Sequence, residues 1–421
     1  MTAYVRTFGC QQNEADSERI KGHLAALGYD FTEDPTVANL AVLNTCAVRE
    51  HAESRAFGHL GALKPWKMAK RGRTLIFCGC MAAEQAVRDK MKSSYPYVDI
   101  ILTPDEIDLI PEKLSSPNSP LSTLNSPLRT PPPKAWLSIM TGCNNFCSYC
   151  IVPHVRGREK SKPAHELVSE FSGLVEQGYK DITLLGQNVN SYRDGDTDFV
   201  ALLKQLCAVN GDYWVRFMTS HPKDCTPELL QFMADQPHMA RHLHLPVQSG
   251  SDRVLGAMNR GYGKERYMGL LDLARKLMPD LTVTSDIIVG FPTESESEFV
   301  NTMDLVERAD FDALFTFIYS RRRGTPAADM EDLSREVKKE RMERLLELQN
   351  GISAGKHAAF KGQILRVLVD GYEQDNDYPL TARTSGNRLV RLTGGADCVG
   401  KFIDAEISDC NSWNLFGRLK T

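Results

Sequence analysis

The chain has 421 residues, which is enough for two or three domains with their own cores. Hydrophobic residues make up 42% and charged residues 25%, and the net charge is −4, as in an ordinary globular protein. This balance excludes nucleic-acid binding through the field of the whole protein, so such a partner would need local basic patches. Neither a signal peptide nor an apolar run of roughly 18 residues is present, so we expect a cytoplasmic protein without a membrane segment.

The first region, residues 1–114, alternates short apolar runs with helical patterns, which predicts an open parallel α/β domain. Its expected strands and helices follow one another in turn: strands 4–8, 39–43 and 74–77, and helices 13–27, 49–64 and 82–92. Residues 115–133 are rich in Ser and Pro and predict a linker, because such a composition cannot bury a core.

From residue 134 the strand–helix rhythm returns six times, which predicts a partial (βα)6 barrel over 134–357 with a charged exit helix at 333–349. The expected barrel strands are 135–140, 181–185, 214–218, 242–247, 282–289 and 313–319. Residues 358–421 change character and predict a small β-barrel, with short strands at 363–370, 380–383, 388–392 and 401–410.

Eleven cysteines in a reducing cytoplasm indicate metal binding or catalysis rather than disulfides. Three of them form a tight motif, Cys143-x3-Cys147-x2-Cys150, directly after the first barrel strand. Three thiolates on one loop suit an iron–sulfur cluster and leave one iron open to a substrate. Zinc would need a fourth ligand, for which His154 is the nearby candidate. Mere packing of the thiols is disfavoured because the loop is polar, with Asn144, Asn145 and Ser148.

Three further cysteines are far apart in sequence but share one structural position. Cys10, Cys46 and Cys80 each end an expected strand of the first domain and precede a helix. Because the carboxyl ends of parallel strands meet at one edge, the three thiols should meet there, beside helix N-termini that favour negative charge. Packing as small hydrophobic residues suits Cys78, Cys207 and Cys225 better. We therefore expect a second three-thiolate site.

The chain resembles the radical S-adenosylmethionine methylthiotransferases along nearly its whole length. The resemblance is carried by Gly9-Cys10, Asn44-Thr45-Cys46, Gly79-Cys80, the Cys143–Cys150 motif, Gly290-Phe291-Pro292-Thr293-Glu294, Tyr319-Ser320-Arg321 and Gly324-Thr325-Pro326-Ala327-Ala328. It implies an N-terminal methylthiotransferase domain, a radical barrel and a C-terminal TRAM module. It also implies S-adenosylmethionine and two 4Fe-4S clusters as cofactors, a tRNA substrate, an electron donor such as flavodoxin or ferredoxin, and a monomer.

The resemblance further implies cofactor contacts at the carboxyl ends of the barrel strands, where ligands of such barrels bind. These are Tyr149, Gln187, Arg216, Ser249 and Asp286, each of which could instead pack or cap. The metal ligands are the six cysteines Cys10, Cys46, Cys80, Cys143, Cys147 and Cys150, and no catalytic residue is assigned beyond them.

Three local stretches resemble the family members that methylthiolate isopentenyladenosine in tRNA. They are Gly9–Asn13, Asn44–Glu50 and the segment from Asn144 to Glu159. Sister enzymes that act on threonylcarbamoyladenosine or on a ribosomal protein are the alternative. A non-catalytic iron–sulfur RNA-binding regulator is a second alternative, against which the Gly186-Gln187 and Gly290-Phe291-Pro292 segments speak.

Basic residues of the C-terminal module lie around one turn, although the module carries eight basic and eight acidic residues. Arg383, Arg388 and Arg391 are expected to contact RNA, since arginines on a small barrel suit backbone and loop contacts. Further arginines are expected to extend this path: Arg156, Arg158, Arg321, Arg322 and Arg323. The alternative for each is a solvated surface position.

Overall fold

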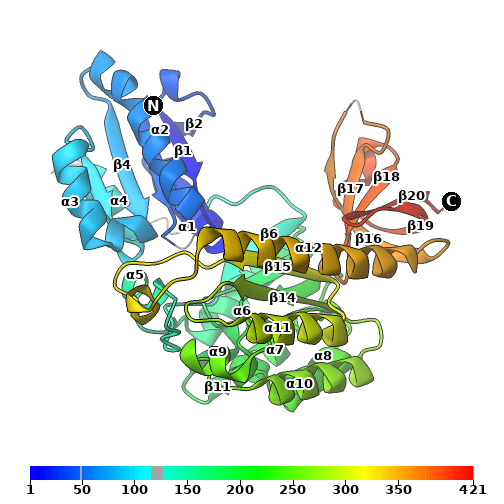
Figure 1. Ribbon diagram of the computed structural model, residues 1–421. Coiled ribbons are helices and arrows are strands. Elements are labelled where there is room, and N and C mark those ends of the chain that lie inside the picture. Colours follow the sequence, from blue (N-terminus) through cyan, green and yellow to red (C-terminus); the bar gives the residue numbers. More distant parts are fainter. Residues whose placement is uncertain (48–49, 115–126, 375, 421) are drawn as a thin grey trace. The chain divides into compact units, whose positions relative to one another are not determined.

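The computed structural model describes residues 1–47, 50–114, 127–374 and 376–420. The chain divides into two compact units (Figure 1). Unit 1 consists of Met1–Thr130, Thr141–Phe146 and Cys150–Lys160, and unit 2 of Pro131–Met140, Cys147–Tyr149 and Ser161–Thr421. No helix among the described residues is long and apolar enough to cross a membrane.

Unit 1 contains a five-stranded, entirely parallel sheet in the order β2-β1-β3-β4-β5, which confirms the predicted α/β class. Its strands are β1 (Thr2–Thr7), β2 (Asp30–Phe31), β3 (Leu40–Thr45), β4 (Thr74–Gly79) and β5 (Ile100–Leu102). Its main helices are α1 (Gln11–Ala26), α2 (Glu50–Ala69), α3 (Gln85–Ser94) and α4 (Ile110–Leu114). The edge strands β2 and β5 were not predicted, because two or three residues are too few to show a strand period.

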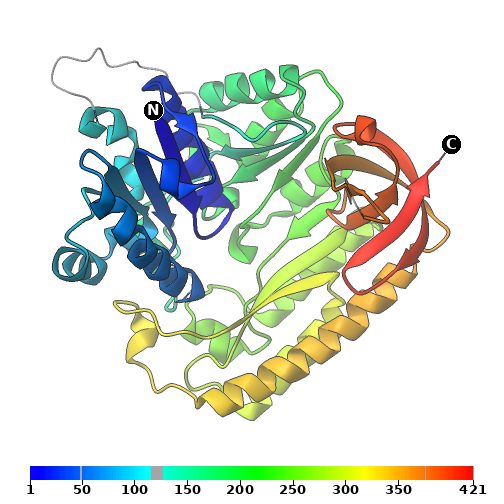
Figure 2. The same cartoon turned by 90° about the horizontal axis from the view of Figure 1, so that it is seen from above.

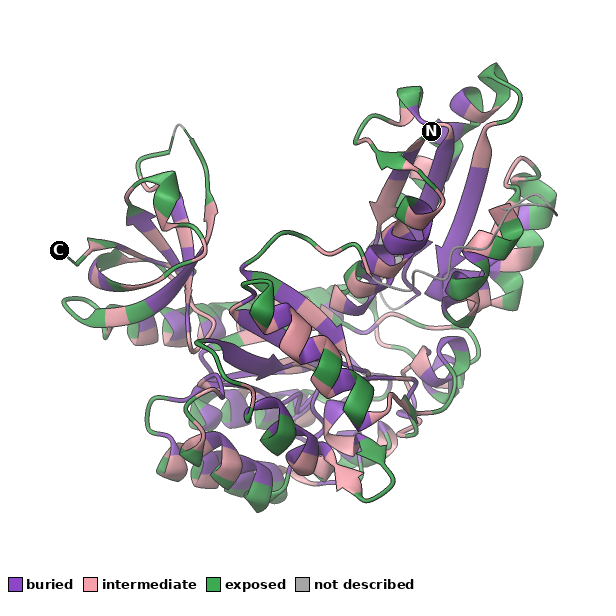
Figure 3. Cartoon of the chain, turned by 180° about the vertical axis from the view of Figure 1, so that it is seen from behind, coloured by how far each residue is buried: buried purple, intermediate pink, exposed green. Residues whose placement is uncertain are grey.

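Both faces of this sheet are buried, because alternate strand residues feed two separate cores (Figure 3). Leu40 and Val42 lie in one core with Ile20 and Leu24 of α1, whereas the intervening Ala41 and Leu43 lie in the other with α2. Cys78 belongs to the first core and is fully buried, as expected for a packing cysteine.

The predicted linker is described only from residue 127 onward, and residues 115–126 lie outside the described residues. Its last part is held on α1 through one residue. The backbone N–H of Leu128 donates to the carbonyl of Glu18, and that of Thr130 donates to the Glu18 carboxylate at 3.2 Å. The predicted domain boundaries stay predictions.

Unit 2 contains the six predicted barrel strands, arranged as two three-stranded parallel sheets in the orders β6-β9-β12 and β13-β14-β15. The strands are β6 (Lys134–Ser138), β9 (Asp181–Leu185), β12 (Trp214–Phe217), β13 (His242–His244), β14 (Thr282–Val289) and β15 (Ala313–Ile318). The helices between and after them are α6 (Ala164–Glu176), α7 (Phe199–Leu206), α8 (Pro227–Asp235), α9 (Asp252–Ala257), α10 (Lys264–Leu277), α11 (Glu296–Ala309) and α12 (Arg335–Ala358). Cys207 and Cys225 lie in the hydrophobic core of this barrel.

After α12 the chain forms a closed five-stranded barrel in the order β16-β17-β18-β20-β19 (Figure 2). The strands are β16 (Ile364–Tyr372), β17 (Leu380–Thr384), β18 (Leu389–Thr393), β19 (Phe402–Cys410) and β20 (Asn414–Leu419). The sequence predicted four strands and missed β20. Its buried positions are Leu415 and Gly417, and a glycine does not contribute to an alternating apolar pattern. A Cβ at Gly417 would lie 2.2 Å from the Glu406 carbonyl oxygen.

Arg216 joins the C-terminal barrel to the larger one, and this corrects its assignment as a cofactor contact. Its Nε donates to both carboxylate oxygens of Asp181, at 2.7 and 2.9 Å. The two Nη atoms donate to the carbonyls of Thr384 and Ser385. The side chain is 3% exposed and binds Asp181 at the amino end of β9, whereas ligands of such barrels bind at the carboxyl ends of the strands.

Arg388, which was expected to contact RNA, also lies at this junction, and this corrects its assignment. Its guanidinium binds Asp312, which follows α11, and lies 4.7 Å over the Phe360 ring. The side chain is 9% exposed. This ion pair and the largely covered side chain favour a role for Arg388 in the junction over a contact with RNA.

Replacing Arg216 tests this junction. Arg216→Met leaves the buried Asp181 carboxylate without its partner, which costs about 3–5 kcal/mol, so we expect a clear fall in the thermal midpoint. The double variant Asp181→Asn/Arg216→Met removes both charges and should recover part of the loss. Scanning calorimetry of the three proteins measures this, and an unchanged midpoint in Arg216→Met would contradict the role of the pair.

Candidate functional site

Cys10, Cys46 and Cys80 follow three neighbouring strands at the carboxyl edge of the unit 1 sheet. Thr7 of β1 pairs with Asn44 of β3, and Asn44 pairs with Cys78 of β4. Two positions further on lie Gly9, Cys46 and Cys80, and Cys10 directly follows Gly9, so the three cysteines follow strand ends at nearly the same level. The sheet order changes direction between β1 and β3, and open parallel sheets bind ligands at such a switch point.

Two glycines let these strand ends approach one another. Gly9 has φ +139°, and a Cβ there would lie 2.6 Å from the Cβ of Cys46. Gly79 has φ +93°, and a Cβ there would lie 2.4 Å from the carbonyl oxygen of Thr45. Any other residue would push the turns apart, so Gly9-Cys10 and Gly79-Cys80 each pair a candidate ligand with the glycine that permits its position.

The surroundings of Cys10 favour a thiolate. A hydrogen bond with Cys46 lowers the pKa of Cys10 to about 6, helped by the backbone N–H groups of Asn13 and Gln12 at the start of α1 and opposed by burial. Burial raises the pKa of Cys80, and the charge of Arg156 opposes that rise. Helix N-termini and nearby arginines stabilise thiolate ligands in this way.

Hydrogen bonds from two asparagine side chains hold these turns together. Asn13 donates to the side-chain oxygen of Asn44 at 3.2 Å and to the carbonyl of Thr45 at 3.0 Å. Asn44 donates in return to the carbonyl of Asn13 at 2.8 Å and to Ser17 Oγ at 3.0 Å. Both asparagines are fully buried. They fix the helix that carries Cys10 against the strand that leads to Cys46.

Arg156 belongs to this site, which corrects its assignment to an RNA path. It is 5% exposed, and its Nε donates to Cys80 Sγ at 3.2 Å. Its Nη2 donates to Asp16 Oδ2 at 2.7 Å. The sequence offered no sign of this contact, because Arg156 lies 76 positions from Cys80.

The Cys143–Cys150 loop is held at both ends. Cys143 and Cys150 belong to unit 1 and Cys147 to unit 2. In unit 1, the N–H of Cys143 donates to the carbonyl of Gly157 at 3.1 Å. In unit 2, Ser148 donates through its N–H to Met258 and through its hydroxyl to Ala257.

His154, the ligand that zinc would need, faces the Phe146 ring edge-on at 6.3 Å. In the described part of the chain, no three His, Cys, Asp or Glu side chains are arranged to hold a metal ion. Whether the cysteine sets suit a cluster therefore depends on their donor atoms and on the groups around them. Thiols beside backbone N–H groups and a buried guanidinium suit a thiolate-bound cluster with net negative charge.

Buried polar atoms without a hydrogen-bond partner gather after β9 and β12, where the barrel would hold its cofactor. Within the described residues these atoms are Asn188 Oδ1, Asn190 Oδ1, Ser220 Oγ and His221 Nε2. Such atoms are costly unless a ligand or water satisfies them. A polar cofactor with amino, carboxylate and hydroxyl groups fits this requirement.

His221 in this group is a neutral donor. Burial lowers its pKa to about 2, aided by the charges of Arg260 and Lys223. Its Nδ1 accepts a hydrogen bond from the N–H of Lys223 at 3.2 Å, so the ring proton lies on Nε2. His221 was not among the site residues predicted from the sequence.

The other expected cofactor contacts differ in their positions. Ser249 is fully buried, and its hydroxyl hydrogen-bonds with Thr302 and accepts from the N–H of Ser251. Asp286 is 24% exposed, with His244 Nε2 at 3.5 Å from its carboxylate. The Tyr149 hydroxyl accepts from Arg260 at 3.4 Å. Gln187 is half-buried after β9.

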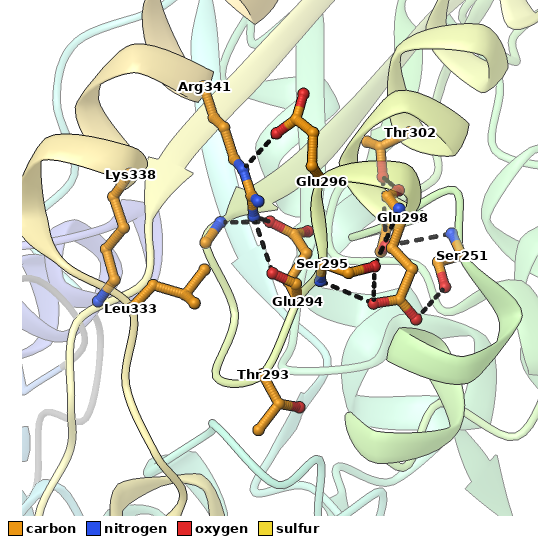
Figure 4. Close-up of polar contacts among 12 residues, drawn as sticks. Ser251, Thr293, Glu294, Ser295, Glu296, Glu298, Thr302, Leu333, Lys338 and Arg341 are labelled. Atoms are coloured by element: carbon orange, nitrogen blue, oxygen red, sulfur yellow. Dashed lines mark hydrogen bonds and ion pairs between the residues drawn. The ribbon is translucent and has the colours of Figure 1, made fainter.

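The Gly290–Glu294 loop after β14 is held by a buried ion pair (Figure 4). The Glu294 carboxylate, 1% exposed, accepts from the N–H of Gly290 at 3.0 Å and from Arg341 of α12 at 2.8 Å. Glu298 of α11 accepts from Ser295 and from Ser251, which follows the Gln248-Ser249-Gly250 segment. The loops after β13 and β14 are thereby fixed together.

Three family models match the chain: "Uncharacterized protein family UPF0004" over residues 2–103, "Radical SAM superfamily" over 137–306 and "TRAM domain" over 358–420. The radical SAM superfamily implies a 4Fe-4S cluster and S-adenosylmethionine. Among solved structures, the radical S-adenosylmethionine methyltransferase TsrM from Kitasatospora setae matches with a TM-score of 0.57 and 12% identity, over 78% of this chain and 75% of that one. That likeness shows the fold alone.

Curated relatives match almost the entire chain. The tRNA-2-methylthio-N(6)-dimethylallyladenosine synthase of Thermoanaerobacter sp. (strain X514) is 44% identical over 99% of this chain and 92% of the relative. The protein of that name from Acetivibrio thermocellus is also 44% identical, over 99% of this chain and 90% of the relative. The chain therefore belongs to the tRNA-2-methylthio-N(6)-dimethylallyladenosine synthase family of radical SAM proteins.

Proposed function

We propose that this chain attaches a methylthio group to carbon 2 of N6-dimethylallyladenosine, also called isopentenyladenosine, next to the anticodon of tRNA. The observation that carries the proposal is that Cys10, Cys46 and Cys80 follow three neighbouring strands at one sheet edge, in a chain that also carries the Cys143–Cys150 motif. The relatives that are 44% identical over 99% of the chain bear the name of this reaction.

In this proposal Cys143, Cys147 and Cys150 hold the 4Fe-4S cluster of the barrel, and Cys10, Cys46 and Cys80 hold a second one. When bound, the two clusters and S-adenosylmethionine supply a 5′-deoxyadenosyl radical and the sulfur that replaces the hydrogen on carbon 2. That hydrogen is unactivated, so no side-chain base could remove it as a proton. The protein's part is to bind, to orient and to exclude water.

We assign the cofactor contacts to Tyr149, Gln187 and Asp286 and add His221. The Nε2–H of His221 is a buried neutral donor without a partner among the described residues. A neutral donor can serve a carboxylate or hydroxyl oxygen of S-adenosylmethionine without bringing a charge into the pocket. The buried Glu294–Arg341 pair holds the Gly290–Glu294 loop in place beside them.

The TRAM module is the proposed RNA-binding part, and the base must leave its stack to reach the barrel. Arg383 and Arg391 remain the proposed contacts. Arg383 is 33% exposed beside Asp370, and Arg391 is 25% exposed beside Glu373. An electron donor such as flavodoxin or ferredoxin, a monomeric state and a cytoplasmic location complete the proposal.

Removing the N-terminal set of three cysteines distinguishes its role from that of the barrel set. Cys10→Ala/Cys46→Ala/Cys80→Ala should bind about half of the iron and still form 5′-deoxyadenosine, because the barrel cluster remains. It should form no methylthiolated tRNA, because the second site is gone. Iron analysis and mass spectrometry after anaerobic reconstitution measure this. Normal product from this variant would contradict the role of the N-terminal set, and zinc in place of iron would contradict both.

The substrate assignment predicts a choice among stem-loops. The enzyme should methylthiolate an anticodon stem-loop carrying isopentenyladenosine roughly 10- to 200-fold more efficiently than one carrying unmodified adenosine, since burial of the isoprenyl group adds a few kcal/mol at most. Competition assays with matched stem-loops give the ratio. Equal or better turnover on a threonylcarbamoyladenosine stem-loop would overturn the substrate and leave the chemistry intact.

The TRAM arginines predict a change in salt dependence. Arg383→Ala/Arg391→Ala should weaken stem-loop binding and lower the slope of log Kd against log salt by roughly 1 to 2, because each phosphate contact contributes about 0.7 to 0.9. Lys361→Ala, an exposed position of the same module that pairs with Asp409, is the matched control. An unchanged slope in the double variant would remove these residues from the interface.

A further inference from the structure

Each cysteine set has one buried arginine that donates to one of its sulfurs. In unit 1, Arg156 Nε lies 3.2 Å from Cys80 Sγ. In unit 2, Arg260 Nη1 lies 3.4 Å from Cys147 Sγ. Both arginines are 5% exposed. Neither arginine was predicted from the sequence to contact a cysteine set.

The two arginines differ in their other partners. Arg156 also donates to Asp16, which is 3% exposed and accepts a further hydrogen bond from Gln12. Arg260 instead donates to the Tyr262 hydroxyl at 3.0 Å and to the Pro246 carbonyl at 3.0 Å, besides the Tyr149 hydroxyl. None of the hydrogen-bond partners of Arg260 in the described chain is a carboxylate.

A buried guanidinium needs a counter-charge, because a desolvated and unpaired charge is costly. A neutral thiol is only a weak hydrogen-bond acceptor, so it does not balance the charge of a buried arginine. A thiolate that ligates a cluster is a full anionic acceptor. For Arg260 it supplies the negative charge that the other partners lack. For Arg156 it adds to the charge of Asp16.

We propose that Arg156 and Arg260 are positioning residues that set the reduction potentials of the two clusters, one arginine for each cluster. The proposal rests on the proposed function, in which both cysteine sets hold clusters. Reduction adds one negative charge at the site, and a fixed buried positive charge stabilises that added charge. Hydrogen bonds to ligand sulfurs and net local charge are known determinants of such potentials. Asp16 offsets part of this effect at the N-terminal site.

The test uses full-length protein, reconstituted anaerobically, in two backgrounds that keep one cluster each. Cys143→Ala/Cys147→Ala/Cys150→Ala keeps the N-terminal cluster, and Cys10→Ala/Cys46→Ala/Cys80→Ala keeps the barrel cluster. Redox titration followed by electron paramagnetic resonance gives each midpoint potential without S-adenosylmethionine or tRNA. The readout is therefore independent of turnover.

In the N-terminal background, Arg156→Gln should shift the potential to a more negative value, and Arg156→Lys should shift it less because the charge is kept. Asp16→Asn should shift it in the opposite direction, because it removes a buried negative charge. In the barrel background, Arg260→Gln should lower the potential and Arg260→Lys should lower it less. A purely structural role would not give shifts of opposite sign for the two members of one ion pair.

Each arginine is the matched control for the other, since Arg156→Gln should leave the barrel cluster unchanged and Arg260→Gln should leave the N-terminal one unchanged. If Arg156→Gln fails to bind iron, Arg156→Lys and Asp16→Asn decide the question. Unchanged potentials with full iron content, or a shift of the same sign from Asp16→Asn, would overturn the proposal. A background that binds no iron at all would instead contradict the proposed function for that cysteine set.

Discussion

Close approach of three backbone turns at the carboxyl edge of the N-terminal sheet is the constraint on which the rest of the site depends. Parallel register brings the ends of β1, β3 and β4 to one level, but side chains at the turns would keep them apart. Gly9 and Gly79 remove that obstacle, since a Cβ at either would lie within 2.6 Å of the neighbouring strand end. Three thiols distant in sequence can meet only because these two positions lack a side chain.

That convergence could be predicted from the sequence, and its surroundings could not. A cysteine after each of three strands follows from local patterns, because hydrophobic periodicity locates strand ends and parallel strands share an edge. Asn13 and Asn44 belong to the motifs around Cys10 and Cys46, but the sequence does not show that their side chains hydrogen-bond with each other. Arg156 was misplaced on an RNA path, because sequence shows a positive charge but not whether it is buried. Long-range ion pairs have no local signature.

The same limit explains Arg216 and Arg388. Arg216 lies in a barrel strand, and the sequence does not show toward which end of the barrel its long side chain extends. In the structure it binds Asp181 and two carbonyls of the C-terminal module. Arg388 lies in a turn between the strands that carry Arg383 and Arg391, and of these three arginines it is the one that pairs with Asp312, with 9% of its side chain exposed. The module is thus attached through charges that sequence analysis assigned to ligands.

The central claim is that one chain holds two clusters on two separate cysteine sets. Anomalous diffraction at the iron edge from anaerobically grown crystals of the reconstituted full-length chain tests it most directly. We predict two iron sites, one bonded to Cys10, Cys46 and Cys80 and the other to Cys143, Cys147 and Cys150. A single iron site, or a second one with different protein ligands, would contradict the account.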